Sequence, residues 1–131
     1  MIGPEVARRL DDERIIWMTT VTSQGQPQSA PVWYVRHAEE IRVWSLDGHR
    51  VTNLADNPRV SLHLNDNGRG DEVVVIEGRA EVDHAIGPAS EDSAYVARYQ
   101  TFVDEYGWTW GWFDANYPIP LRISPSRVRA W

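Results

Sequence analysis

The segment from Ser45 to Arg50 combines residue types and spacings that favour the binding of an anion. It reads Ser-Leu-Asp-Gly-His-Arg and leads from the end of a predicted strand, through a glycine turn, into a predicted helix. Backbone amides at a helix N-terminus lack partners and carry partial positive charge, so they attract phosphate. Gly48 lets a ligand approach the backbone, and Arg50 supplies a full positive charge. His49 and Ser45 can add hydrogen bonds.

The composition narrows the possible partners of such a site. Nineteen acidic against thirteen basic residues give a formal charge of −6, which argues against nucleic-acid binding. All thirteen basic residues are Arg, whose planar fork binds oxyanions through two parallel hydrogen bonds. The alternative interpretation of Arg50 is an ordinary surface charge, because a glycine turn before a short helix is common. These residues alone do not decide between the two.

Several other classes of site are excluded or not expected. Without Cys there are no disulfides, thiolate metal sites or cysteine nucleophiles. The four His residues have no paired ligand spacing, so no metal site is expected. The stretch from His63 to Gly68 resembles the start of a calcium loop, but the twelfth position is Val74 where a bidentate Glu is required. There is no G-x-S-x-G hydrolase motif and no G-x-G-x-x-G dinucleotide motif.

The elements that would position the anion site are mostly strands. Alternating apolar and β-branched residues predict strands over residues 15–21, 28–36, 41–45, 60–64 and 72–82, and two short final strands over 121–123 and 127–129. Apolar residues three and four apart predict helices over residues 5–10, 49–56 and 91–106, with a loop over 108–113. Pro31 indicates an edge strand or a bulge, because proline cannot donate to the ladder. We expect one domain, residues 1–131, that is mainly β and forms an antiparallel barrel of about six strands.

The order of short motifs along about nine-tenths of the chain resembles a known family, the pyridoxamine-phosphate-oxidase-like split barrels. It is most similar to their actinobacterial branch of deazaflavin-dependent (coenzyme F-420) oxidoreductases. The resemblance implies a six-stranded antiparallel split β-barrel of the FMN-binding type that works as a homodimer. It rests on residues 19–21, 25–27, 31–34, 45–50, 53–54, 57–62, 75–81 and 125–128.

The resemblance also implies where the cofactor binds. Arg50 matches the basic residue that holds the cofactor phosphate in the family, although the usual residue there is Lys. The same comparison places Trp44, Ser45, Gly48 and His49 along the cofactor chain, and Pro31, Val32 and Trp33 beside its ring. True pyridoxine-phosphate oxidases carry basic residues around an apolar stretch of the second strand, whereas this chain has Ala-Pro-Val-Trp-Tyr-Val at 30–35. This difference favours F-420 over FMN and argues against pyridoxine-phosphate oxidase activity.

The function implied by the resemblance is that of an oxidoreductase. Such an enzyme transfers a hydride from reduced F-420 to a small organic acceptor, namely an enone, a quinone or a tetrapyrrole. The alternatives are an FMN-binding protein of the same family and a non-catalytic cofactor-binding module. His49, His63 and Tyr34 are candidate general acids, but no catalytic residue is assigned.

The expected partners are a small-molecule substrate and a second copy of the chain, with the cofactor at the dimer interface. Trp108, Trp110, Trp112 and Trp131 are candidates for that interface, because Trp is favoured at buried interface centres. No apolar run reaches the roughly 20 residues of a membrane span, and residues 1–10 lack a signal-type apolar stretch. We therefore expect neither membrane nor nucleic-acid partners and a cytoplasmic location.

Overall fold

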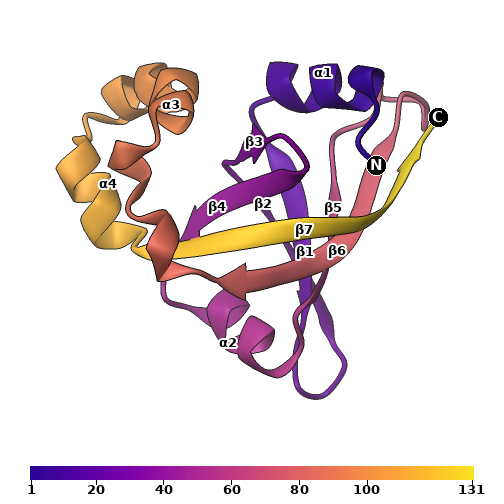
Figure 1. Ribbon diagram of the computed structural model, residues 1–131, viewed down its shortest axis with the longest axis horizontal. Helices are drawn as coiled ribbons and strands as arrows, with labels where there is room; N and C mark the ends of the chain where they lie inside the picture. Colours follow the sequence, from indigo (N-terminus) through magenta and orange to yellow (C-terminus); the bar gives the residue numbers. More distant parts are fainter.

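Seven antiparallel strands form one curled sheet in the computed structural model, which describes residues 1–131 (Figure 1). Their order across the sheet is β2-β1-β5-β6-β7-β4-β3. β6 lies in the middle and buries Val74 and Ile76, as expected for the most apolar strand. The strands are β1 (Ile16–Val21), β2 (Pro27–Val32), β3 (Val35–His37), β4 (Glu40–Ser45), β5 (Arg59–His63), β6 (Val74–Val82) and β7 (Ile119–Ala130).

The two edges of the sheet are neighbours in the sequence. β2 ends at Val32 and β3 begins at Val35, yet they lie at opposite ends of the strand order. Only Trp33 and Tyr34 join the edges, so the sheet must curl round into a half-barrel. Pro31 lies on the edge strand β2, where its missing amide hydrogen disturbs no ladder beyond β1. We call this junction, residues 32–35, the seam.

Two separate hydrophobic clusters lie on either side of the seam. The larger fills the barrel with sixteen buried residues and includes Tyr34. The smaller lies between the helices and the end of β4, and Trp33 packs against it. Consecutive residues of the seam therefore point into different clusters. The smaller cluster consists of Val35, Trp44, Ala89, Tyr95, Tyr99 and Phe113.

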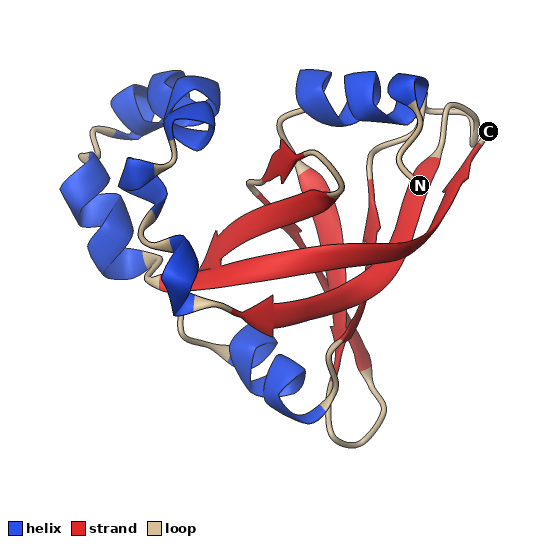
Figure 2. Cartoon of the chain, viewed as in Figure 1, coloured by secondary structure: helices blue, strands red, loops and turns tan.

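The helices lie outside the sheet at three places (Figure 2). α3 (Ser93–Tyr106) and α4 (Trp110–Asn116) lie together on one side, α1 (Pro4–Asp12) lies at one end, and α2 (His49–Asp56) lies below β6 and β7. Asp92 begins α3 by accepting a hydrogen bond from the Tyr95 amide at 2.9 Å, and Gly107, with φ of 70°, ends it. Two 3-10 turns, His84–Ile86 and Ala89–Glu91, connect β6 to α3.

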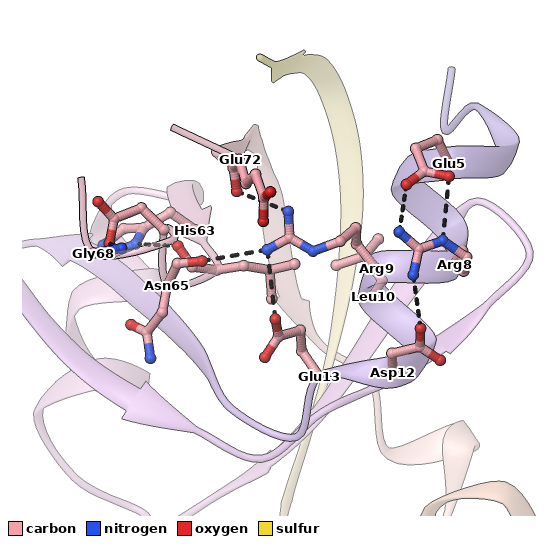
Figure 3. A network of polar contacts seen from close by, with 12 residues as sticks. Glu5, Arg8, Arg9, Leu10, Asp12, Glu13, His63, Asn65, Gly68 and Glu72 are labelled. Carbon is pink, nitrogen blue, oxygen red and sulfur yellow. Dashed lines mark hydrogen bonds and ion pairs between the residues drawn. The ribbon is translucent and has the colours of Figure 1, made fainter. Parts of the chain in front are cut away.

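The two arginines in the middle of α1 have different partners, and Arg9 connects the helix to other parts of the chain (Figure 3). Arg9 donates to the carbonyl oxygens of Glu72 at 2.7 Å and Asn65 at 3.3 Å, and it pairs with the Glu13 carboxylate at 3.4 Å. Arg8 pairs with Glu5 and Asp12 on the helix surface. Both arginines of α1 are therefore paired with groups of the protein itself.

Four expectations about the elements were wrong. The sheet has seven strands rather than the six that the resemblance implies. The predicted strand 28–36 is interrupted where the chain crosses from β2 to β3. The two predicted final strands are one, β7, since a register shift between Glu77 and Gly78 accommodates Pro125. Residues 108–113 are not all loop, because Thr109 accepts a hydrogen bond from the Trp112 amide and begins α4.

Candidate functional site

Two adjoining pockets lie where the end of β4, the start of α2 and the seam meet. Their volumes are about 320 Å³ and 570 Å³, within or near the usual range for small-molecule sites. Ser45, Leu46 and Arg50 line both, so Arg50 lies at the boundary between them. Every residue predicted to contact a cofactor lines at least one pocket: Pro31, Val32, Trp33, Trp44, Ser45, Gly48, His49 and Arg50.

The smaller pocket is mostly aromatic, and we call it the aromatic pocket. The seam forms one wall through Trp33, and the end of β4 adds Trp44. α3 adds Tyr95 and α4 adds Phe113, whose ring stacks on that of Trp33 with centroids 5.6 Å apart. Such walls suit a flat conjugated ligand. Its lining residues are Pro31, Val32, Trp33, Trp44, Ser45, Leu46, Arg50, Tyr95, Tyr106, Trp108, Phe113 and Tyr117.

The larger pocket is lined mostly by residues of polar type, and we call it the polar pocket. β1, β2 and the start of α2 form its walls. Its lining residues are Met18, Thr20, Gln28, Ser29, Ala30, Ser45, Leu46, Gly48, His49 and Arg50.

Arg50 is a half-buried cation without a counter-ion. Its Nη1 donates to Ser45 Oγ at 3.0 Å, and no carboxylate lies within ion-pair distance. Burial lowers the pKa of the Arg50 guanidinium below its ordinary value, although such a group remains charged. A half-buried charge that lacks a partner is costly, and a bound anion would remove that cost.

Each of the other half-buried arginines has a carboxylate or several carbonyl oxygens of the protein beside its charge. Arg9, Arg36, Arg42 and Arg122 each contact a carboxylate. Arg98 has no carboxylate but donates to four backbone carbonyl oxygens, including that of Asp11 at 2.7 Å. Arg50 is therefore the exception among them.

Neither pocket contains an acidic residue. The chain has nineteen Asp and Glu residues, yet none is among the lining residues of the aromatic or the polar pocket. Arg50 and His49 are the only ionisable basic groups there. A protein of net charge −6 thus presents a local environment that accepts a negative charge.

The buried side-chain amide of Asn53 orients the side chains of Thr20 and Gln28 at the polar pocket. Asn53, on α2, donates through Nδ2 to Thr20 Oγ1 and to Gln28 Oε1, both at 2.9 Å. Because Thr20 Oγ1 accepts this bond, its own hydrogen is free to donate. Because Gln28 uses its oxygen, its Nε2 hydrogens are free as well. Two further donors therefore border the polar pocket beside Arg50.

The start of α2 leaves room for a ligand against the backbone. Gly48 precedes the helix, no side chain caps it, and its first turn contains no acidic residue. A Cβ built on Gly48 would meet nothing within 4 Å. The unpaired amides of the first turn are thus accessible from the polar pocket.

The candidate general acids differ in position. His49 is exposed and lines the polar pocket. Tyr34 is fully buried in the barrel, where its hydroxyl donates towards the carbonyl oxygens of Leu10 at 2.5 Å and Glu13 at 3.0 Å. His63 stacks on Trp17 and lines neither pocket. The structure therefore excludes Tyr34 and His63 from both pockets.

Several lining residues were not predicted. Thr20 and Gln28 belong to predicted strands, but nothing in the sequence shows that Asn53 reaches them from α2. Tyr95 and Tyr106 belong to the stripe of apolar residues that predicts the helix 91–106, and both border the aromatic pocket. A stripe on a helix does not reveal which of its residues faces a cavity.

The structure contains no group of three or more His, Asp or Glu side chains arranged to hold a metal ion. None of the helices combines the length and the apolar character that a membrane span requires.

Comparison with solved structures shows similar folds over nearly the whole chain. A conserved hypothetical protein from Mycobacterium tuberculosis, Rv2991, is 25% identical with a TM-score of 0.77, and the match covers 100% of this chain and 84% of that one. An FAD-binding protein from Mesorhizobium loti, mll6688, is 24% identical with a TM-score of 0.70, covering 95% and 87% of the two chains. An F420 reductase is 20% identical with a TM-score of 0.66, covering 97% and 98%.

Comparison with family models identifies the family. No curated protein matches the sequence. The family model described as pyridoxamine 5'-phosphate oxidase, in contrast, matches residues 2–113, which include both edges of the sheet, the start of α2 and most of the lining of the two pockets. With this match and the half-barrel fold, the chain belongs to the pyridoxamine 5'-phosphate oxidase family.

Proposed function

We propose that the protein is an oxidoreductase that binds a flavin-type cofactor across the two pockets, with the cofactor phosphate at Arg50. The cofactor we favour is the deazaflavin F-420, whose reduced form supplies a hydride to a small organic acceptor. The observation that carries the proposal is the position of Arg50, a half-buried cation without a carboxylate at the boundary of two pockets free of acidic residues. FMN remains the alternative cofactor.

The residues of the chain have separate roles in this proposal. Arg50 and the first amides of α2 bind the phosphate, and Gly48 leaves the space for it. Thr20 and Gln28 donate hydrogen bonds to the polar chain of the cofactor. Trp33 and Trp44 provide flat apolar surfaces beside the ring, and the surrounding aromatic side chains exclude water from it.

The choice of F-420 over FMN rests on the end of β2. Pro31, Val32 and Trp33 line the aromatic pocket with apolar atoms and bring no basic group to the ring. A fluorescence titration of the purified protein with F-420 and, in parallel, with FMN tests the choice. Tighter binding of F-420 supports the proposal, tighter binding of FMN reverses the choice of cofactor, and binding of neither overturns the assignment of the site.

Replacement of Arg50 tests the placement of the phosphate. Arg50→Ala should weaken the preferred cofactor about 10- to 150-fold, which corresponds to the loss of a charged hydrogen bond of about 1.5–3 kcal/mol. Arg69→Ala is the matched control, because Arg69 is exposed, forms no ion pair and lines neither pocket. Equal dissociation constants for Arg50→Ala and the unmodified protein would contradict the proposed phosphate site.

A non-catalytic module that only holds the cofactor is the second candidate. The two candidates differ in one observation, because an enzyme oxidises the reduced cofactor when an acceptor is added. Cofactor absorbance that stays constant with enone, quinone and tetrapyrrole acceptors would favour the binding module.

We also propose that the protein is a homodimer in the cytoplasm. Leu46 and Tyr106 border the aromatic pocket, yet they are 53% and 65% exposed. Exposed apolar residues at the rim of a pocket are suited to contact with a second copy. A chain without Cys needs no oxidising compartment, which is compatible with a cytoplasmic location.

A further inference from the structure

The few polar side chains that the fold buries gather at the polar pocket. Tyrosines aside, the buried polar residues are Thr20, Ser45 and Asn53. Thr20 and Ser45 line the polar pocket, and Asn53 donates a hydrogen bond to Thr20. Burial of a polar group is unfavourable, and proteins compensate for it with hydrogen bonds. The concentration of these groups at a single pocket indicates that they serve the pocket rather than the core.

Asn53 joins two side chains that lie opposite each other on neighbouring strands. Thr20 on β1 and Gln28 on β2 are register partners, so both side chains lie on the same face of the sheet. The Nδ2 group of Asn53 has two hydrogens, and it donates to Thr20 Oγ1 and to Gln28 Oε1, each at 2.9 Å. Asn53 itself lines neither pocket. It can therefore act on a ligand only through its neighbours.

Gln28 is the neighbour that a ligand can reach. It lies on the edge strand β2, is exposed, and lines the polar pocket. A long side chain on an exposed edge has several rotamers, and ordering it costs conformational entropy. The bond from Asn53 holds the Gln28 oxygen, which leaves the Nε2 hydrogens for an acceptor in the pocket. Gln28 is thus ordered before a ligand binds, which favours binding.

The same helix carries the cation of the site. Arg50 and Asn53 are three residues apart on α2, and residues with this spacing lie on one face of a helix. Arg50 bonds to Ser45 at the end of β4, whereas Asn53 bonds to β1 and β2. One face of α2 therefore fixes two donors of the polar pocket, its own guanidinium and the side-chain amide of Gln28.

We propose that Asn53 is a positioning residue, which holds the Gln28 amide so that its Nε2 donates to an oxygen atom of an anionic ligand bound at Arg50. This role rests on the proposed function in one respect, namely that the polar pocket binds the anionic part of the ligand. Asn53 contacts no ligand in this arrangement. Its effect on binding passes through Gln28, and an experiment can isolate that dependence.

A double-mutant cycle of Asn53→Ala and Gln28→Ala isolates it. Fluorescence titration measures the dissociation constants of FMN and F-420, and phosphorus NMR measures that of inorganic phosphate, at a temperature at which circular dichroism shows every variant folded. Each single variant should weaken every ligand that the unmodified protein binds about five- to tenfold, and the double variant should be no weaker than the singles. Asn116→Ala is the matched control, because Asn116 donates to the Trp112 carbonyl oxygen and lines neither pocket.

A purely structural role for Asn53 gives a different result. If Asn53 only holds α2 against the sheet, its loss displaces Arg50, whether or not Gln28 is present. The effects of the two substitutions then multiply, to about 25- to 100-fold in the double variant. Multiplied effects, or an unchanged dissociation constant in Asn53→Ala, would overturn the positioning role.

Gln28→Glu tests the donor without removing Asn53. Glutamate has the same shape and keeps an oxygen that accepts from Asn53, but it has no Nε2 hydrogens. Because Gln28 is exposed on an edge strand, Tm should change little. Gln28→Glu should weaken each ligand at least as much as Gln28→Ala, because it turns an acceptor towards the anion. Equal affinities of Gln28→Glu and the unmodified protein would overturn the positioning role even if Asn53→Ala does not fold.

The failure of this role can be distinguished from the failure of the proposed function. If a cofactor binds and Arg50→Ala weakens it, but the cycle shows multiplied effects, the proposed function stands and the positioning role fails. If neither cofactor binds, but inorganic phosphate does and shows the expected cycle, the positioning role stands and the proposed function fails. If none of the three ligands binds to the unmodified protein, both are overturned.

Discussion

Arg50 shows how a single side chain acquires a function from its neighbours. The sequence contains thirteen arginines, and residue type alone does not separate one from another. What distinguishes Arg50 is a combination of partial burial, a single bond to Ser45 and a surrounding surface without carboxylates. Only the folded chain creates that combination, because the residues that line the two pockets come from three strands, three helices and the segments between them.

Three buried tyrosines should make the protein sensitive to alkaline pH. Burial raises the pKa values of Tyr34, Tyr95 and Tyr99 above their ordinary value of about 10. Above that pH the unfolded chain releases protons that the folded chain retains, so the contribution of the three tyrosines to the free energy of unfolding should be constant below about pH 10 and fall as the pH rises further. Urea unfolding between about pH 8 and pH 11 measures the effect. Tyrosinate absorbance from these three residues near pH 10, before unfolding, would contradict it.

The sequence predicts the strand and turn residues of the site better than its helical wall. The residues 45–50 lie in one segment, so a strand end, a glycine and a helix start are visible as a pattern. Tyr95 and Tyr106 come from the helix predicted over residues 91–106, where the spacing of apolar residues does not show that part of the helix borders a cavity. The hydrogen bond from Asn53 to Gln28 is a property of the tertiary structure alone.

At the scale of elements, two glycines, one within β6 and one before α2, should respond to different extents to replacement by Ala. A Cβ on Gly78 would lie 2.5 Å from the Ser124 carbonyl oxygen, whereas a Cβ on Gly48 would lie in open space. Gly78→Ala should lower the free energy of unfolding by about 1–3 kcal/mol, since it forces β6 and β7 apart. Gly48→Ala should lower it by less than about 1 kcal/mol.

The Gly48→Ala and Gly78→Ala variants also separate an effect on the free energy of unfolding from an effect on cofactor binding. Gly48→Ala should weaken the preferred cofactor several-fold, because its methyl group would occupy the space next to the first amides of α2. Urea unfolding and the fluorescence titration measure the two effects on the same preparations. Unchanged cofactor affinity in Gly48→Ala would show that the phosphate does not approach the backbone there.

Strand existence was predictable, whereas strand continuity was not. Strand residues are found in every segment predicted to be a strand, because alternation of apolar residues reflects a sheet with one buried face. The interruption at Trp33 and Tyr34 depends on the chain crossing between sheet edges, which is a property of topology. The continuity of β7 through Pro125 depends on the register shift opposite Gly78 on another strand. In both cases the cause lies in the arrangement of the whole sheet and cannot be seen in the neighbouring sequence.

At the scale of the whole molecule, the proposed dimer predicts a mass of about 30 kDa, twice the 15.0 kDa of one chain. Light scattering after size-exclusion chromatography measures it. A second copy over the exposed rim residues Leu46 and Tyr106 would cover the opening of the aromatic pocket. A 15.0 kDa particle that still binds the preferred cofactor with full affinity would show that one chain contains the complete site.

The central position of β7 has a consequence for the synthesis of the protein. β7 pairs with β6 on one side and with β4 on the other, and no other strand joins the β3-β4 hairpin to the rest of the sheet. A ribosome makes β7 after every other strand, so the sheet remains in two unconnected parts until residues 119–130 have left it. The aromatic residues of α3 and α4 meanwhile lack the finished sheet on which they pack. The nascent chain therefore completes its fold only after translation has passed β7.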